Sequence, residues 1–217
     1  MKYFICLIIG YLVGSVSMAA ILSRAAKVDL RKNGTGNLGA SNTFLVLGKG
    51  YGVIVLLFDM AKSFVIIKLS AHLFPEIGFA GMLAGCGAVA GHIFPFYMKF
   101  KGGKGLAAFC GMILAFDPAD FAVMLVIAVI LVLAVNYTAA MPLTLSVLFP
   151  VFVRLNSANI PSLIIALATG ALMIAAHSKN IKKAYDGTDI KVREYIRSEL
   201  FSKTDKESVI GGNDYNE

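Results

Sequence analysis

One short basic run has the composition of a phosphate-binding loop: Lys101, Gly102, Gly103, Lys104 and Gly105. An apolar segment follows at once, so the run is predicted to open a helix. Glycines let the backbone approach an anion closely, and a helix N-terminus offers free N–H groups and the positive end of the helix dipole. The alternative is a flexible loop that carries positive charge at the cytoplasmic face, which needs the lysines but not the glycines. The spacing differs from that of a Walker A loop.

A second glycine-rich stretch, residues 34–39, matches the pattern G-x-G-x-x-G of dinucleotide-binding proteins. That interpretation fails because no strand is predicted before it, and because Asp59, the acidic residue further along, lies inside an apolar segment. What remains is a polar loop of about twenty residues, and loops of that length are usually functional or disordered. Its small donors suit phosphate or hydroxyl binding. The candidate ligands are Gly34, Thr35, Gly36, Asn37, Ser41 and Asn42.

Three polar residues follow the last apolar segment: His177, Asn180 and Asp189. His177 and Asn180 are three positions apart, so they share one face if the helix continues. The histidine is a candidate general base. The alternative is a structural role, because a histidine near a helix C-terminus is favourable simply as a cation.

Two charged residues, Asp59 and Lys62, lie three positions apart inside an apolar segment. Charges inside a membrane are costly and by default functional, although a mutually neutralising structural pair explains them equally well. His92 follows a glycine and precedes Pro95. It either lines a polar site or satisfies backbone groups that the proline leaves unpaired.

The composition that surrounds these residues is that of a membrane protein. The chain has 217 residues, of which 58% are hydrophobic and 15% charged, and its mean hydropathy is +0.76. Soluble domains average about 45–50% apolar and about 25% charged residues. The net charge of +7 therefore reports topology rather than nucleic-acid binding. Three cysteines, all in apolar segments, fit no metal or disulfide pattern and are expected to be core residues.

Seven apolar segments predict an all-α, polytopic fold with about seven transmembrane helices. The first lacks a signal-peptide cleavage pattern and is interpreted as a retained helix. We expect one transmembrane domain, residues 1–177, with cytoplasmic loops at 24–50 and 98–105, and a cytoplasmic tail at 178–217. The seven segments are about 4–23, 51–70, 77–98, 106–116, 119–135, 137–153 and 160–176.

Basic residues set the predicted orientation. With the N-terminus outside, 16 of the 20 lysines and arginines fall in the two inner loops and the tail, which satisfies the positive-inside rule. The C-terminus is then cytoplasmic, and the chain lies in a bacterial inner membrane with its chemistry at the cytoplasmic face. This orientation requires segment 106–116 to count as one crossing, although a helix of that length is only roughly 16 Å long and is too short to span the membrane alone. Its first end is therefore expected to be recessed, beside a polar cavity at residues 102–105.

The C-terminal sequence IKVREYIRSELF offers two structures. Ile190, Tyr195, Ile196 and Leu200 have partly helical spacing, which predicts an amphipathic helix on the membrane surface. A solvated tail is the equal alternative, because positive and negative charges nearly balance.

Taken together, these motifs resemble the PlsY family, the acyl-phosphate:glycerol-3-phosphate acyltransferases of bacterial phospholipid synthesis. The resemblance covers nearly the whole chain in order. It rests on the stretches GYLVGSVSMAAILS, NGTGNLGASN, LGKGYGVIVLLFDMAKS, GHIFPFYMKFKGGKGLA and HSKNIKKAYDGTD.

The resemblance implies acyl transfer from acyl phosphate to the sn-1 hydroxyl of glycerol 3-phosphate, which gives lysophosphatidic acid. The glycine-rich loop, here Gly102 to Gly105, would bind the phosphate with Lys104, while His177 and Asn180 match the family's His and Asn motif. We therefore expect His177, Asn180, Lys104 and Thr35 to be catalytic and Asp189 to bind substrate. Its implied partners are both substrates, the lipid bilayer and the soluble enzyme that forms acyl phosphate. It implies no cofactor, and we expect no metal and no nucleic acid.

Several positions depart from the family pattern. Thr35 replaces a serine but keeps the hydroxyl, and Asp189 and Lys183 replace a glutamate and an arginine. Leu45 stands where the family has an arginine that is regarded as functional, and a leucine cannot bind phosphate; Lys49 or Lys101 are candidate replacements. An active acyltransferase is therefore weighed against a divergent relative that binds phosphate ligands, and against a small transporter. The transporter is disfavoured because intramembrane charge is nearly confined to one segment.

In the implied mechanism phosphate leaves directly, so no covalent enzyme intermediate is needed. Lys101, Lys104 and the helix dipole would offset the repulsion between two anionic substrates. The proton acceptor is His177 or, alternatively, a substrate phosphate.

Overall fold

The structure is a computed structural model that describes residues 1–157, 159–189 and 191–194. The predicted surface helix of the C-terminal sequence rests largely on Ile190, Tyr195, Ile196 and Leu200, which lie outside the described residues. Within the described part the chain is helical, and its one β-type pairing is an isolated bridge between Tyr137 and Lys191.

Each of the seven apolar segments lies mainly within helix, which confirms the all-α prediction. Two short helices were not predicted as such, α3 in the first polar loop and α10 after the last apolar segment. The helices are α1 Lys2–Ser15, α2 Met18–Ala25, α3 Ala40–Leu47, α4 Lys49–Leu73, α5 Ala80–Ile93, the 3-10 helix η1 Phe96–Met98, α6 Leu106–Phe116, α7 Pro118–Val135, α8 Ala140–Asn156, α9 Ile160–Ala176 and α10 Ser178–Tyr185.

Small residues allow α1 and α5 to pack with their backbones in contact. Gly10 and Gly14 of α1 face backbone atoms of α5, while Gly87 and Gly91 of α5 face backbone atoms of α1. A Cβ at any of the four would overlap those atoms. Helices in membranes associate through such small-xxx-small faces, because lipid supplies no hydrophobic drive for their association. The α1–α5 pair is therefore held by close van der Waals contact.

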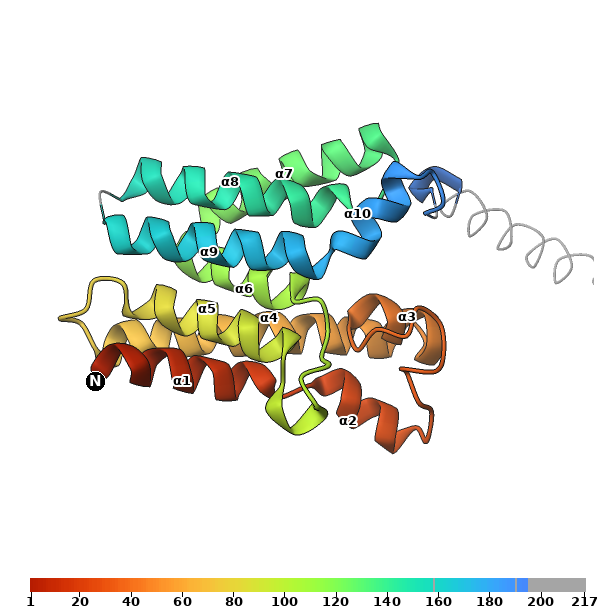
Figure 1. Cartoon of the computed structure of the whole chain (residues 1–217), viewed down its shortest axis with the longest axis horizontal. Helices are drawn as coiled ribbons and strands as arrows, with labels where there is room; N and C mark the ends of the chain where they lie inside the picture. The colour runs from red at the N-terminus through yellow and green to blue at the C-terminus, as the bar shows by residue number, and fades with distance from the viewer. Residues whose placement is uncertain (158, 190, 195–217) are drawn as a thin grey trace, which may run out of the picture.

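The short helix α6 lies inside the bundle, where it packs against α4, α5 and α7 (Figure 1). Phe109 and Met112 of α6 are buried, and Phe109 packs edge-on against Phe149 of α8 with ring centroids 5.5 Å apart. Protein therefore surrounds most of this helix, which explains how eleven residues can suffice at membrane depth.

The outward faces of several helices are apolar and exposed, as on Leu57 of α4 and on Val126 and Ile130 of α7. By length and composition, three helical stretches of the described chain could cross a membrane: Lys2–Ala25, Ala80–Met98 and Pro118–Val135. A bent pair, α9 with α10, makes a fourth if counted as one span. Seven crossings therefore stay a prediction.

The loops sort onto two opposite ends of the bundle. At one end the N-terminus meets the α4–α5 loop, where Lys2 hydrogen-bonds Glu76, and Asn156 hydrogen-bonds Asp120. At the other end lie α2, α3, the loop that precedes α6, and α10 (Figure 1). All three polar regions predicted to carry chemistry are thus at the same end.

The chain after α10 folds back onto the corner between α7 and α8. The Val192 N–H donates to the carbonyl of Asn136 across 3.1 Å, and the Arg193 N–H donates to the Asn136 Oδ1 across 2.8 Å. The Arg193 guanidinium also donates to the carbonyl of Leu133. We call Val192 and Arg193 with these contacts the tail clamp.

Candidate active site

The glycine-rich loop runs back toward the end of α5. The Gly102 N–H donates to the carbonyl of Ile93 across 2.9 Å, and the Gly103 N–H donates to that of His92 across 3.1 Å. A Cβ at Gly103 would overlap the His92 ring and the carbonyl of Leu38. Gly105 has φ +87°, a conformation that side chains disfavour. The space beside Gly103, where a polar cavity was expected, is filled by His92 and Leu38.

Lys104 reaches from this loop to α10. Its Nζ donates to the Oδ1 of Asn180 across 2.5 Å, so the structure joins two predicted site residues that are 76 positions apart. Burial lowers the pKa of Lys104; the charge of Asp189 opposes this shift, and Lys183 and Lys179 add to it. The ammonium group therefore lies in a partly dry, basic environment in which an anion would be stabilised.

His177 lies at the break between α9 and α10. The two helices meet at 58°, so the continuous helix that would put His177 and Asn180 on one face is not present. The two residues are still adjacent, because the Asn180 N–H donates to the carbonyl of His177 across 2.9 Å. The bend turns α10, and Asn180 with it, toward Lys104.

The tautomer of His177 follows from its hydrogen bond. Its Nδ1 is 2.9 Å from the carbonyl oxygen of Met173, which can only accept, so Nδ1 carries the proton. In the neutral ring Nε2 is then a hydrogen-bond acceptor. Burial lowers the pKa of His177 and so does the nearby Lys104, while the bond to Met173 opposes them. The ring is thus held as a neutral base.

Asp189 completes this group from the turn that follows α10. Its charge favours the protonated form of Lys104. Its Oδ2 is buried and has no hydrogen-bond partner among the described residues. An unpaired buried acceptor is costly, which marks it as a group that a hydroxyl donor of a ligand could satisfy.

Asn42 organises the first polar loop from inside. It is fully buried; its Oδ1 accepts the Thr35 N–H across 2.6 Å, and its Nδ2 donates to the carbonyls of Leu30 and Asn33. Gly34 has φ +60°, and a Cβ there would overlap the Asn42 amide. The amide of Asn42 is therefore already used by the loop, so Asn42 positions Thr35 rather than offering its own side chain to a ligand.

Other residues of this loop remain accessible. Thr35, Gly36 and Ser41 are exposed, and Asn37 is half-buried. Gly36 has φ +72° and its N–H donates to the carbonyl of Asn33, which closes a tight turn. The loop approaches the glycine-rich loop through Leu38, so both phosphate-binding candidates belong to one continuous surface.

Arg31 is a second link between the two loops, and sequence reasoning missed it. Its guanidinium donates to the carbonyl of Lys101 across 2.6 Å. Nothing in the sequence separates it from the other basic residues of the same loop. The Lys101 side chain is exposed, whereas its backbone is fixed by this bond.

Beneath the glycine-rich loop lies a buried polar group, Asp59, Lys62 and His92. The Lys62 Nζ is 2.7 Å from the Asp59 Oδ1, 3.2 Å from the His92 Nδ1 and 2.6 Å from the carbonyl of Val16. Lys62 is 7% exposed and Asp59 2%. Asp59 and Lys62 thus form the mutually neutralising pair, and His92 connects this pair to Gly103.

The position of the missing family arginine is on the surface. Leu45, on α3, is 51% exposed. Lys49, one proposed replacement, lies over the ring of Phe44, with its Nζ 5.8 Å from the ring centroid. An arginine at position 45 would have room to extend.

Comparison with known proteins places these features in a family. The sequence model of the glycerol-3-phosphate acyltransferase family matches residues 4–187. The glycerol-3-phosphate acyltransferase of Macrococcus caseolyticus is 36% identical over 89% of this chain and 98% of its own. That of Aquifex aeolicus is 32% identical over 87% of this chain and 98% of its own.

A solved structure is also similar. The crystal structure of PlsY (YgiH), an integral membrane glycerol 3-phosphate acyltransferase in its glycerol 3-phosphate form, superposes with a TM-score of 0.81 and 29% identity. The alignment covers 88% of this chain and 96% of that one. The chain belongs to the glycerol-3-phosphate acyltransferase family.

Proposed function

We propose that Lys104, Asn180, His177 and Asp189 form the active site of this membrane acyltransferase. The observation that carries the proposal is the hydrogen bond from Lys104 to Asn180, beside a histidine held as a neutral base. The chain transfers an acyl group from acyl phosphate to glycerol 3-phosphate, in the first step of phospholipid synthesis. The solved relatives in glycerol 3-phosphate and lysophosphatidic acid forms support the same two ligands here.

The phosphate of glycerol 3-phosphate would lie between the two loops. Lys104 supplies the partly desolvated charge, and the N–H groups at the start of α6 add the helix dipole. The Gly34 N–H, the Thr35 and Ser41 hydroxyls and the Asn37 side-chain amide offer donors from the facing loop. Gly36 shapes its turn, because its own N–H already donates to the carbonyl of Asn33. Electrostatic attraction here offsets repulsion between two anionic substrates.

The reaction then needs one proton acceptor. The sn-1 hydroxyl oxygen attacks the carbonyl carbon of acyl phosphate, the new ester bond forms, and the bond from carbon to phosphate oxygen breaks. The His177 Nε2 takes the hydroxyl proton, and phosphate leaves with the bonding electrons. Asp189 is placed to accept a hydrogen bond from a glycerol hydroxyl through its Oδ2, which has no partner among the described residues.

An apolar cavity next to Asn180 is the proposed acyl-chain site. It has a volume of about 420 Å³ and opens between α7, α8 and α10. Ile181 and Ala184 of α10 line one side of it, and Leu131, Val135 and Leu143 line the other. An acyl chain placed here would extend from the reacting carbonyl toward the bilayer.

We propose that the site end of the bundle faces the cytoplasm of a bacterium. The three loop regions at that end carry most of the lysines and arginines, as the positive-inside rule requires. Seven crossings with the N-terminus outside follow from the same count. A soluble enzyme that forms acyl phosphate would then reach the site from the cytoplasm.

The test is phosphate release from palmitoyl phosphate by the whole protein in a lipid mesophase. Release should require glycerol 3-phosphate, and Lys104→Ala should lower it about 100- to 1,000-fold, the usual effect of losing one preorganised donor. Lys182→Ala is the matched control, since Lys182 is an exposed lysine of α10 whose charge is not among those that shift the pKa of Lys104, and it should release phosphate normally.

The exposed Leu45 supports a second candidate, a relative that binds phosphate ligands without catalysing transfer. Leu45→Arg separates the two. Phosphate release by the native protein would show that other residues compensate for the missing arginine at position 45. Release by Leu45→Arg alone would identify a chain that has lost the reaction.

A further inference from the structure

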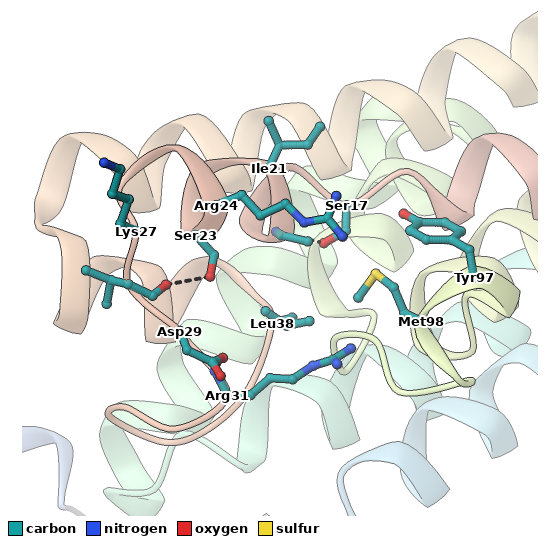
Figure 2. Close-up of a pocket in the computed structure, with 12 residues that line it drawn as sticks. Ser17, Ile21, Ser23, Arg24, Lys27, Asp29, Arg31, Leu38, Tyr97 and Met98 are labelled. Atoms are coloured by element: carbon teal, nitrogen blue, oxygen red, sulfur yellow. Dashed lines mark hydrogen bonds between the residues drawn. The ribbon is translucent and has the colours of Figure 1, made fainter.

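A second cavity with a basic wall lies apart from the proposed active site. It has a volume of about 420 Å³ and lies between α2, the residues that follow α2, and η1 (Figure 2). Arg24, Lys27 and Arg31 line it with one acidic residue, Asp29. Its lining includes none of the four residues assigned to catalysis.

Among the residues that the structure describes, two of the three cations of this cavity, Arg24 and Lys27, have side chains without a hydrogen-bond or ion-pair partner. The Arg31 guanidinium is occupied, because it donates to the carbonyl of Lys101. The backbone N–H of Arg31 donates to the Asp29 Oδ1 across 3.0 Å. Figure 2 shows the Arg24 side chain directed across the cavity toward Tyr97. The cavity therefore attracts an anion.

The rim of the same cavity is apolar and lies where a membrane surface would be. The helical stretch Lys2–Ala25 is long and apolar enough to span, so the end of α2 would reach the headgroup region. Ile21 and Tyr97 line the cavity and are more than half exposed, and Phe96 and Phe100 beside them are exposed too. Aromatic side chains gather at membrane interfaces in this manner.

The position of Tyr97 is fixed. Its hydroxyl donates to the carbonyl of Ser15 across 2.6 Å, at the break between α1 and α2. Tyr97 is thus a rigid aromatic wall of the cavity, Arg24 extends across toward it, and Lys27 lines the cavity on the far side (Figure 2). A ligand that fits both the wall and the cations must have an anionic head and an apolar body.

We propose that this cavity binds the phosphate headgroup of an anionic membrane phospholipid. The phosphate lies between Arg24 and Lys27, and the acyl chains follow Ile21 and Tyr97 into the bilayer. Basic pockets at the cytoplasmic ends of membrane helices recognise such headgroups. A purely topological role for the two cations requires their charge but neither a cavity nor an apolar rim. The inference rests on membrane insertion and does not depend on the proposed catalytic residues.

Binding can be measured by native mass spectrometry of the whole protein in detergent. The probes are phosphatidylglycerol, phosphatidylcholine with the same acyl chains, and inorganic phosphate. The variants are Arg24→Gln, Lys27→Gln and, as matched control, Lys32→Gln, an exposed cation of the same loop that does not line the cavity.

We expect the native protein to retain phosphatidylglycerol in preference to phosphatidylcholine. Each cavity variant should weaken that retention about fivefold, the usual effect of one basic residue near an anionic lipid surface, and the control should not. Acyltransferase activity of the variants in a neutral detergent should stay at the native level. Equal retention of the two lipids, or an equal loss in Lys32→Gln, would refute the site. Phosphate bound as tightly as phosphatidylglycerol would show a free-anion site instead.

Discussion

His92 contacts Gly103 through both its backbone carbonyl and its side-chain ring. The Gly103 N–H donates to the His92 carbonyl across 3.1 Å, and the His92 ring fills the space that a side chain at position 103 would need. The same ring is 3.2 Å from the Nζ of Lys62. His92 therefore contacts both the buried charge pair of α4 and the glycine-rich loop.

Gly103→Ala should lower kcat/KM about 100-fold, because a loop displaced by the ring misplaces Lys104 by an ångström or so. The change should act mainly through KM for glycerol 3-phosphate. Steady-state phosphate release measures both constants. Gly50→Ala is the control, since a Cβ there meets nothing within 4 Å. Native kinetics in Gly103→Ala would contradict the contact.

Lys62→Met should destabilise the protein by about 3–5 kcal/mol, because it leaves the Asp59 carboxylate buried without its partner. Adding Asp59→Asn removes the orphaned charge, so the double variant should be more stable than Lys62→Met. Thermal unfolding in detergent compares them. A double variant less stable than either single would show that the pair contributes more than mutual neutralisation.

The pH dependence of kcat/KM should reveal His177 as a base. Burial and Lys104 lower its pKa from 6.5, so the neutral ring persists below that value and the acid limb of the profile lies below 6.5. The free energy of unfolding should depend on pH in the same direction. Because the pKa of His177 is lower in the folded chain than in the unfolded chain, the unfolded chain binds the proton first as the pH falls. The contribution of His177 to stability is therefore fully present above pH 6.5 and is lost at lower pH. Loss of the acid limb in His177→Gln, with residual turnover, would confirm the assignment. An acid limb that survives unchanged would point to a substrate phosphate.

Gly14→Ala should destabilise the bundle by roughly 1–3 kcal/mol, the usual effect of inserting a methyl group into a tightly packed contact. The added Cβ would overlap α5 backbone. Gly50→Ala, an equal change at an open helical position, should be neutral or slightly stabilising. The difference between the two melting temperatures in one detergent is the measurement, and equal melting temperatures would argue against close α1–α5 packing.

The sequence predicted most of the helices because apolar runs of this length form few other structures in a membrane. It also predicted Lys104, Asn180, His177 and Thr35 as catalytic residues, which stays a prediction, and it put His177 and Asn180 on one face only if the helix continued. The 58° bend could not be foreseen, since no proline or glycine marks position 177. Helix breaks of this kind depend on packing between elements distant in the chain.

Asn42 shows what sequence reasoning cannot resolve. A buried asparagine that satisfies its own loop and one that binds a ligand look identical as residue types. Only the positions of Leu30, Asn33 and Thr35 around it decide between them. The sequence could not assign a role to Arg31 or to His92 for a similar reason. Arg31 bonds to Lys101, about 70 positions away, and His92 contacts Lys62, about 30 positions away.

The tail clamp has a practical consequence for handling this enzyme. Val192 and Arg193 fasten the end of the described chain to Asn136, so α10 is anchored at both ends, and Asn180 lies within that anchored segment. An affinity tag or a reporter fused close behind Arg193 would pull on the element that meets Lys104. A tag at Met1, at the opposite end of the bundle (Figure 1), would leave that element undisturbed.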